Sequence, residues 1–391
     1  MRRFAPSTRA SRASEAIVER ILGHLRPGVA NLAPGTAHWS PPARLIAESV
    51  AGSSGYGDCR GEAQLLDACR NKLERESGAN MARRDVMVTT GANQAFAHAL
   101  LAVCDPGDEV ILFRPYYFSH LVAVQLLGLQ PVFLDCDAHS GLPDVGALHI
   151  ALQRPAVRAC VLVSPSNPTG AVCPTNVVAR IRADCHAAGT WLISDEAYEH
   201  FLFGSAQFSS PLNSLGAAGE DECVLSLHTF SKSYGLAAWR VGYLSYPVHL
   251  HDSLLKVQDT LPTHACRASQ RVALAALDQL GTPWVEDRVG TLDPARRLLW
   301  EAVRPLHDKL TPQPDGAFYY WLPLPPHLAH DDEAAVRWLA EDYNLLLLPG
   351  SAFGRPGFLR LAYGTLADAD AATLIAERLS RAVDALQSDS R

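Results

Sequence analysis

The central part of the chain alternates short apolar, β-branched runs with longer segments in which apolar residues recur at helical spacing. Seven runs indicate strands: VMVTT, EVILF, PVFLD, ACVLVSP, TWLISD, CVLSLHT and RVGYL. Segments such as GANQAFAHALLAV and PTNVVARIRADCHAAG, which lie between these runs, indicate helices. Strands that alternate with helices are typical of βαβ units. The pattern therefore predicts an α/β fold, with a mostly parallel seven-stranded sheet between two layers of helices in an α/β/α sandwich.

The pattern changes after Leu250. Long helices are expected in QRVALAALDQL and PARRLLWEAVRPL, strands in GAFYYWLPL and FLRLAYG, and a closing helix in AATLIAERLSRAVDALQ. This mixture predicts a second, smaller α+β domain that the N-terminal arm completes. The expected division is an arm and part of the small domain over residues 1–45, a large domain over 46–285 and a small C-terminal domain over 286–391.

Composition and charge argue against several classes of protein. The chain has 391 residues, of which 48% are hydrophobic and 19% charged, and its net charge of -7 argues against a nucleic-acid surface. The longest apolar runs are too short to cross a bilayer, so no membrane association is expected. The nine cysteines show no CxxC pair and no zinc-type Cys/His spacing. We therefore expect free thiols, no metal site and a reducing compartment, the cytoplasm.

The N-terminal segment MRRFAPSTRASRASE is rich in Arg and Ser and has no acidic residue before Glu15. This composition is similar to that of a transit peptide. Because Arg is abundant throughout the chain, we favour a basic arm that leads into a helix expected in SEAIVERILGHL, with a targeting segment as the alternative.

Lysine is scarce, which narrows the search for a catalytic amine. The four lysines are Lys72, Lys232, Lys256 and Lys309. In TFSKSYGLAAWRVGYL, Lys232 follows a predicted strand among small hydroxyl residues, and Arg240 lies eight residues further on. An enzyme that uses pyridoxal 5′-phosphate (PLP) needs an amine to condense with the aldehyde, and a cation with hydroxyls to hold the phosphate. Lys232 can supply the amine, and Thr229, Ser231 and Arg240 can hold the phosphate. Taken alone, the segment is equally compatible with a surface lysine and a structural arginine.

Two other strand ends carry polar residues that suit the same cofactor. Asp195 ends the strand in LISDEAY, where a carboxylate can keep a pyridine nitrogen protonated, and the phenol of Tyr198 can reach the ring's 3-oxygen. Asn167, in the turn SNPTG, can donate to that oxygen or to a substrate carboxylate. An Asp that caps the next helix and a plain Asn-Pro turn are the ordinary alternatives.

A glycine turn precedes one of the predicted helices. In TTGANQAF the chain passes from strand to helix at Gly91, Ala92 and Asn93. The backbone N–H groups and the positive end of a helix suit a phosphate group. Such turns are common, so this one is informative only together with the other segments.

The four segments GAN, SNPTG, DEAY and SKxxGxxxxR occur in the order found in the fold type I aminotransferases. The chain resembles a class I/II aminotransferase from about Leu32 to its last helix. It is most similar to the plant aromatic aminotransferases that use methionine as amino donor to oxo acids such as indole-3-pyruvate. The segments AHWSPP, GANQAFAHALLAVCDPGDEVILFRPYYF, KVQDTLP with SQRVALAAL, and PGSAFGRPGFLRLAYG carry this similarity.

The resemblance implies roles for further residues. Tyr117 falls where the family stacks an aromatic ring on PLP, and Tyr56 where a tyrosine reaches the phosphate of the other subunit, which implies a homodimer. Gly35 falls where the backbone meets the substrate carboxylate, and Arg360 matches the arginine that binds this carboxylate through two hydrogen bonds. Trp39 is expected to contact the substrate, as part of an aromatic rim that also includes Tyr116 and Phe118.

The resemblance also implies a ping-pong reaction with an amino acid and a 2-oxo acid as substrates. In it Lys232 releases the aldehyde to the incoming amine and then moves the proton between the α-carbon and the cofactor's C4′. Aromatic amino acids and methionine are the expected donors. A second arginine for a dicarboxylate side chain is not obvious, although His264 and Arg267 keep that possibility open.

Two alternatives belong to different reaction or protein classes. A PLP-dependent lyase or cyclase with the same fold would also use Lys232, Asp195 and Tyr198. A non-catalytic regulator with an aminotransferase-like domain would need a DNA-binding module, for which the segment before Leu32 is short.

Overall fold

The central sheet has the seven strands that the sequence pattern predicts. The computed structural model describes residues 6–15, 17–50, 55–213, 220–308 and 311–388. The strand order is β2 (Arg84–Thr89), β8 (Gly242–Pro247), β7 (Val224–Thr229), β6 (Trp191–Asp195), β5 (Val157–Val163), β3 (Glu109–Arg114) and β4 (Gln130–Asp135). Only β8 runs antiparallel to its neighbours, β2 and β7. The predicted α/β fold with a mostly parallel sheet is therefore confirmed.

Alternation of side chains along the strands divides the core into two layers. In β2, Val86 and Val88 face one hydrophobic cluster, whereas Met87 belongs to the other. In β3, Ile111 belongs to the cluster of Val86 and Val88, and Val110 belongs to the cluster of Met87. Because successive strand residues point to opposite faces, a strand that is apolar at every position needs a cover of helices on both sides.

The helices supply these covers. One face of the sheet packs against α5 (Ala92–Val103), α6 (Phe118–Leu126) and α9 (His251–Thr260). The other packs against α4 (Ala63–Ser77) and α8 (Thr175–Ala188), with α10 (Arg267–Gln279) packed against α4. The other α-helices described before residue 291 are α1 (Thr8–Arg12), α2 (Ile17–Leu22), α3 (Ala43–Ser49), α7 (Val145–Ala151) and α11 (Gly281–Gly290).

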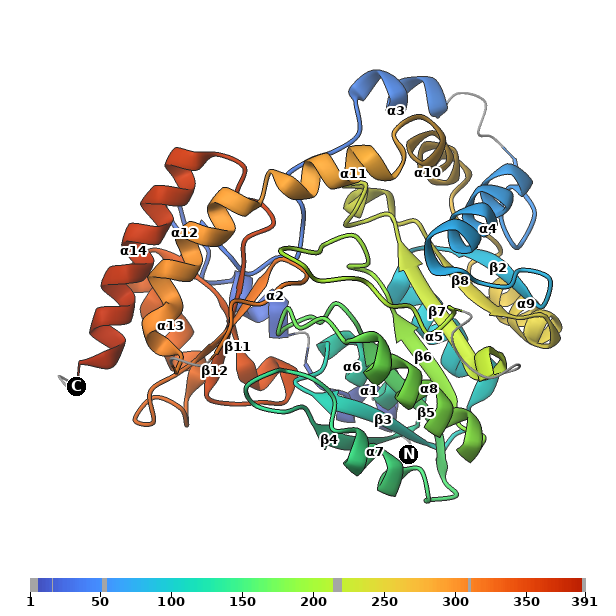
Figure 1. Cartoon of the computed structure of the whole chain (residues 1–391), viewed down its shortest axis with the longest axis horizontal. Coiled ribbons are helices and arrows are strands. Elements are labelled where there is room, and N and C mark those ends of the chain that lie inside the picture. The colour runs from blue at the N-terminus through green and yellow to red at the C-terminus, as the bar shows by residue number, and fades with distance from the viewer. Residues whose placement is uncertain (1–5, 16, 51–54, 214–219, 309–310, 389–391) are drawn as a thin grey trace.

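A second, antiparallel sheet lies in the C-terminal part, where Figure 1 shows the last helices grouped apart from the large sheet. Its strand order is β11 (Leu348–Pro349), β12 (Phe358–Ala362) and β9 (Tyr319–Pro323). The helices beside it are α12 (Asp293–Val303), α13 (Asp332–Asp342) and α14 (Ala369–Gln387). The short strand β1 (Ala30–Asn31) pairs in parallel with β10 (Leu345–Leu346), which ties the N-terminal arm to this part. The boundaries expected after residues 45 and 285 stay predictions.

The fold brings the carboxyl ends of β5, β6 and β7 to one edge of the large sheet. These strands end at Val163, Asp195 and Thr229, immediately before the segments that carry the candidate chemistry. Ligands of open α/β sheets bind at this edge. Within the described ranges, no helix combines the length and apolar character needed to cross a membrane.

Candidate active site

A cavity of about 970 Å³ lies at this edge of the sheet. Most of the predicted site residues line it, although they come from segments spread over more than three hundred positions. The predicted residues in its wall are Gly35, Ala92, Asn93, Tyr117, Asn167, Asp195, Tyr198, Thr229, Ser231, Lys232, Arg240 and Arg360. Trp39 and Tyr56 are absent from the wall, and Gly91 lies directly behind it.

Of the lysines in the described ranges, Lys232 is the one that faces this cavity. It lies three residues after β7, and its Nζ donates a hydrogen bond to the carbonyl of Gly35. Burial and the nearby Arg360 guanidinium lower the pKa of Lys232 to about 8, although Asp195 opposes part of this shift. Near neutral pH a useful fraction of this amine is therefore uncharged and nucleophilic.

The other lysines occupy different environments. Lys72 is buried on α4 between two carboxylates, and Lys256 is exposed on α9. Lys309 lies outside the described residues.

One end of the cavity is built to accept an anion. Gly91 precedes α5 with a φ of 90°, and a Cβ atom at this position would lie 2.8 Å from Nη2 of Arg240. Glycine therefore allows the arginine to lie against the amino end of the helix. No side chain of the described residues caps this end, so its N–H groups and positive dipole are available to a ligand.

Two hydroxyls and a guanidinium complete this cradle. Thr229 donates from Oγ1 to Oγ of Ser231 at 2.9 Å, and Nη1 of Arg240 lies 3.4 Å from the same Oγ. Arg240 has a φ of 50°, which non-glycine residues rarely adopt. Such a conformation is typical of functional sites, where the surroundings hold a residue against local strain. The cradle matches the shape and charge of a phosphate group.

Asp195 is held by a histidine that the sequence analysis missed. Its Oδ2 lies 3.2 Å from Nε2 of His120, and both side chains are buried. Its Oδ1 accepts a hydrogen bond from the backbone of Ala197, in a turn rather than a helix, so Asp195 does not have the helix-capping role that was its ordinary alternative. His120 follows Tyr117 by one helical turn, and this spacing on a predicted helix was the signal that could have found it.

Arg360 also lines the cavity, with only 2% of its surface exposed. Nη1 donates to the side-chain oxygen of Asn167 at 2.9 Å, and Nη2 donates to the carbonyl of Ala33. The guanidinium also lies over the rings of Tyr319 and Phe353, at 4.5 and 5.0 Å from their centroids. No acidic side chain of the described residues forms an ion pair with it. An uncompensated buried guanidinium is a strong site for a carboxylate ligand.

Tyr319, on β9, is a second residue that the sequence analysis missed. Its hydroxyl lies 2.5 Å from the hydroxyl of Tyr198. Burial raises the pKa of Tyr319 to about 12 and, with the Tyr319 hydroxyl, raises the pKa of Tyr198 well above its ordinary value. A Cβ atom at Gly35 would lie 2.1 Å from the Tyr319 hydroxyl, so this backbone can approach only as glycine. Alternation within GAFYYWLPL shows that Tyr319 and Tyr320 face opposite sides, but it does not show which one faces the site.

Two aromatic residues predicted at the substrate rim lie elsewhere. Trp39 is buried: its Nε1 donates to the carbonyl of Ser233 at 3.0 Å, and its ring stacks on Phe201. Tyr116 stacks on Phe133 and does not line the cavity. Trp39 thus packs beneath the Lys232 loop, and its predicted substrate contact stays a prediction.

Tyr56 and its neighbours lie outside the cavity of their own chain. The Tyr56 side chain is 88% exposed and meets His264 edge-on, with ring centroids 5.9 Å apart. Arg267 is engaged by Glu62, with Nε 2.8 Å from Oε1. Neither His264 nor Arg267 lines the cavity.

Comparisons with known proteins assign this geometry to a family. Residues 37–377 match the family described as aminotransferase class I and II. The chain belongs to this family. It is therefore an aminotransferase, and the family's dependence on PLP implies that cofactor here.

Relatives of this aminotransferase include enzymes named for different substrates. It is 34% identical to the aromatic aminotransferase ISS1 of Arabidopsis thaliana, over 91% of this chain and 90% of that one. It is 30% identical to an aspartate aminotransferase of Streptomyces avermitilis, over 81% of this chain and 78% of the relative.

Solved structures of aminotransferases are also similar to this chain along most of its length. The aspartate aminotransferase of Thermus thermophilus with maleate superposes with a TM-score of 0.87 at 27% identity, covering 98% of this chain and 100% of that one. The aromatic aminotransferase of Pyrococcus horikoshii OT3 superposes with a TM-score of 0.83, also at 27% identity, covering 94% and 99%. These similarities confirm the fold type I architecture of the aminotransferase.

The environment of Lys232 predicts a measurable pH dependence. Competitive labelling of the cofactor-free aminotransferase with an acylating reagent, read by mass spectrometry, should give a midpoint near pH 8 for Lys232 because burial and Arg360 disfavour its charged form. Replacing the cation by Arg360→Leu should move the midpoint upward. Exposed Lys256 serves as the reference for reagent reactivity in the same digest. A midpoint that Arg360→Leu leaves unchanged would contradict this account of the Lys232 environment.

Proposed function

We propose that this aminotransferase moves the amino group of an L-amino acid with an aromatic or other large apolar side chain, methionine included, to a 2-oxo acid by a ping-pong reaction. The observation that carries the proposal is that a half-buried amine, Lys232, and a buried guanidinium without an acidic partner, Arg360, face one cavity whose remaining wall is mostly uncharged. An amino acid needs partners for both its amine and its carboxylate, and the two side chains supply them.

The side chains that line the cavity fit the separate parts of PLP, which are its phosphate, its ring and its aldehyde. Bound PLP supplies an aldehyde for Lys232 and a ring that withdraws electrons from the substrate. The cradle of Gly91, Ala92, Asn93, Thr229, Ser231 and Arg240 is proposed to hold the phosphate, and Tyr117 to cover the ring. Asp195, positioned by His120, is proposed to keep a proton on the ring nitrogen.

Proton transfer is assigned to Lys232. Its lowered pKa makes it a base near neutral pH, and its position between Gly35 and Asp195 places the amine within the cavity. General-base catalysis of this kind is worth roughly 10²–10⁴-fold in rate. Tyr198, which stays protonated because its pKa is raised, is proposed to donate to the cofactor's 3-oxygen together with Asn167.

The substrate carboxylate is assigned to Arg360. Asn167 and the carbonyl of Ala33 hold the guanidinium from one side, and the backbone of Gly35 lies in the same wall. This arrangement leaves Nε of Arg360 without a hydrogen-bond partner among the described residues. A carboxylate that reaches the guanidinium from the cavity would neutralise its charge.

The charge distribution favours a large apolar side chain on the substrate. Among the described residues, the basic side chains of the wall are Lys232, Arg240 and Arg360, and each already has an assigned partner. Val18, Phe118 and Leu348 supply apolar surface to the same wall. A hollow that shares Val18 and Phe118 continues between α2 and α6, where Glu15 and Glu19 would repel an acidic side chain.

A homodimer follows from the proposed role of Tyr56. The exposed ring has no place in its own cavity, so its proposed contact with a phosphate must be made in a second copy of the chain. Contacts that two copies exchange reciprocally are typical of twofold-symmetric dimers.

A PLP-dependent lyase or cyclase is the second candidate, because Lys232, Asp195 and Tyr198 would serve those reactions equally well. Release of ammonia without a required oxo acid would favour it. The family match favours transamination.

The first prediction from the proposed function concerns the amine of Lys232. Purified protein should absorb visible light, and Lys232→Ala should lose this band together with at least about 10²–10⁴-fold in turnover, because the base is removed. Absorbance spectra and steady-state rates measure both effects, and the matched control is Lys256→Ala on exposed α9. Borohydride reduction should attach the cofactor to the peptide that contains Lys232. Attachment at Lys72 or Lys256 would overturn the assignment.

The second prediction separates the two roles of Asp195. Asp195→Asn keeps an oxygen for the backbone of Ala197 but removes the charge proposed for the ring nitrogen. Turnover should therefore fall far more than PLP affinity, measured by equilibrium titration. Asp135→Asn, at the end of the edge strand β4 and outside the cavity, is the control. Equal losses of turnover and affinity would indicate a purely structural Asp195.

The third prediction concerns the substrate. With one fixed oxo acid, kcat/KM should be higher for phenylalanine, tryptophan and methionine than for aspartate. Burial of apolar surface is worth roughly 25 cal/mol per Å², so a phenyl side chain gains a few kcal/mol over alanine. Aspartate would lose hydration of its side-chain charge without gaining a cation. Phe118→Ala should reduce the preference for phenylalanine selectively. If aspartate equals the aromatic donors, the substrate proposal fails, and Arg267→Ala would then test a contribution from the second subunit.

A further inference from the structure

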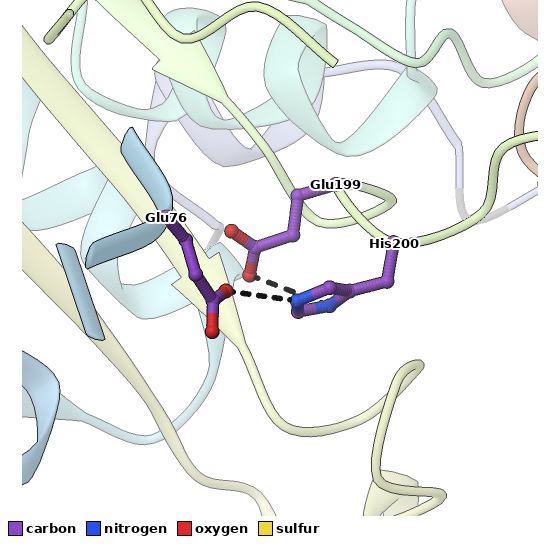
Figure 2. Close-up of side chains that lie close together, drawn as sticks. All are labelled: Glu76, Glu199 and His200. Atoms are coloured by element: carbon purple, nitrogen blue, oxygen red, sulfur yellow. Dashed lines mark hydrogen bonds and ion pairs between the residues drawn. The ribbon is translucent and has the colours of Figure 1, made fainter. Parts of the chain in front are cut away.

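A group of buried polar side chains lies beneath the Lys232 loop, outside the cavity. Figure 2 shows Glu76, Glu199 and His200 pointing toward one another. Nζ of Lys72 lies 3.0 Å from Oε2 of Glu76 and 2.8 Å from Oε1 of Glu199. Burial opposes ionisation of both carboxyls, but the Lys72 ammonium and His200 hold the pKa of each below its ordinary range. Both carboxylates are therefore charged and can only accept hydrogen bonds.

The arrangement is not an open metal site. Two carboxylates and an imidazole are a plausible set of ligands for a cation. However, the ammonium of Lys72 already lies between Glu76 and Glu199, at the position such a cation would take. Lys72 therefore supplies the positive charge that balances these carboxylates. The role of the group follows from the segments of the chain that it holds in place.

His200 links this group to the Lys232 loop. Its Nε2 lies 3.0 Å from Oε2 of Glu76, and its Nδ1 lies 2.9 Å from Oγ of Ser233, the residue that follows Lys232. Because Glu76 can only accept, Nε2 must carry the proton. In the neutral ring, Nδ1 therefore accepts a hydrogen bond from the Ser233 hydroxyl.

The chain Ser233–His200–Glu76 has the order of a hydrolytic triad, but its setting excludes that activity. Ser233 has only 2% of its surface exposed, and it does not line the cavity. A nucleophile must be reachable by a substrate, and this hydroxyl is not. The same two contacts instead fix the position of a backbone segment.

The segment after Lys232 is held at several points. The Ser233 hydroxyl is bound by His200, and the Ser233 carbonyl accepts from Nε1 of Trp39 at 3.0 Å. Two residues on, a Cβ atom at Gly235 would lie 2.0 Å from the Trp39 carbonyl, so the loop packs closely on the arm. Glu76 is in turn fixed by Oγ1 of Thr282, which donates to its Oε1 at 2.7 Å.

We propose that His200 is a positioning residue: by holding Ser233 against helix α4 through Glu76, it sets the direction in which Lys232 enters the cavity. The inference rests on the proposed role of Lys232 as the reacting amine. Misplacing a reacting group by about 1 Å can cost on the order of 10²-fold in rate. The effect of His200 is therefore expected on kcat, with KM nearly unchanged.

Two substitutions at His200 separate its contacts. The side-chain oxygen of Asn in His200→Asn can replace Nδ1 and accept from Ser233. The amide of Gln in His200→Gln reaches the Nε2 position and keeps Glu76 but loses Ser233. We expect His200→Asn to retain most of kcat, and His200→Gln to lose roughly 10–100-fold. Ser233→Ala should match His200→Gln, and the double variant should lose no more than either single one.

His98 offers a control for removing a buried imidazole. It is 1% exposed on α5, and neither ring nitrogen has a hydrogen-bond partner among the described residues. His98→Gln should lower the unfolding temperature without affecting kcat. If His200→Asn and His200→Gln lose equal activity, or if His98→Gln loses as much kcat as His200→Gln, the positioning role is wrong.

A second measurement does not depend on turnover. In the cofactor-free protein, hydrogen–deuterium exchange of the peptide covering residues 230–236 should accelerate in His200→Gln and Ser233→Ala, but not in His200→Asn or His98→Gln. Unchanged exchange in His200→Gln would overturn the proposal even if its activity fell. Conversely, if Lys232→Ala kept full turnover, the proposed function would fail, whereas the exchange pattern would still report whether His200 holds the loop.

Discussion

The site depends on the burial of one positive charge without an acidic partner. Moving a charge out of water is costly unless other groups replace the lost hydration. For Arg360 the replacements are neutral: an amide oxygen of Asn167, the carbonyl of Ala33 and the faces of two aromatic rings. These groups hold the guanidinium in place but do not neutralise it. Burial and then the remaining field of Arg360 lower the pKa of Lys232, and the same field favours an anion in the cavity.

This constraint explains why the site needs both sheets. Arg360 belongs to β12 of the small sheet, Asn167 follows β5 of the large one, and Ala33 lies on the N-terminal arm beside β1. β12 carries the guanidinium, and the other two segments each contribute one oxygen that accepts a hydrogen bond from it. Pairing of β1 with β10 brings the arm to the C-terminal part, and the arm in turn carries Gly35 to Lys232. Lys232, the proposed catalytic amine, and Arg360, the proposed substrate anchor, are therefore positioned relative to each other by contacts between sheets.

The sequence was informative where chemistry follows a strand end. Lys232, Asp195 and Asn167 follow apolar runs that could only be buried strands, so the topology placed their side chains at one edge. The seven strands themselves followed from periodicity. Arg360 could not be found in this way, because an arginine within a strand is usually structural, and it was identified only through family resemblance.

The contacts that the sequence did not show have a common physical cause. Trp39 was expected in an aromatic substrate rim, and in the structure its indole stacks on Phe201 and donates to the Ser233 carbonyl. His120 and Tyr319 were missed because each acts through a partner distant in sequence, Asp195 and Tyr198. Periodicity identifies the faces of an element, but only tertiary packing decides which polar atoms meet. Relatives named for aspartate and for aromatic substrates are both similar to this chain, so membership of the family does not by itself fix the substrate.

The contact between Arg360 and Ala33 joins positions 327 residues apart. The residues of the proposed phosphate cradle, by contrast, all precede Gly242, and strand β8, which pairs with β2 beside them, ends at Pro247. Domains generally fold as units during synthesis, beginning from the N-terminus, and contacts between distant residues form late. A growing chain therefore acquires the means to hold an anionic cofactor well before it can select an amino acid. Substrate recognition is the last property to appear, because it requires the end of the chain to return to its beginning.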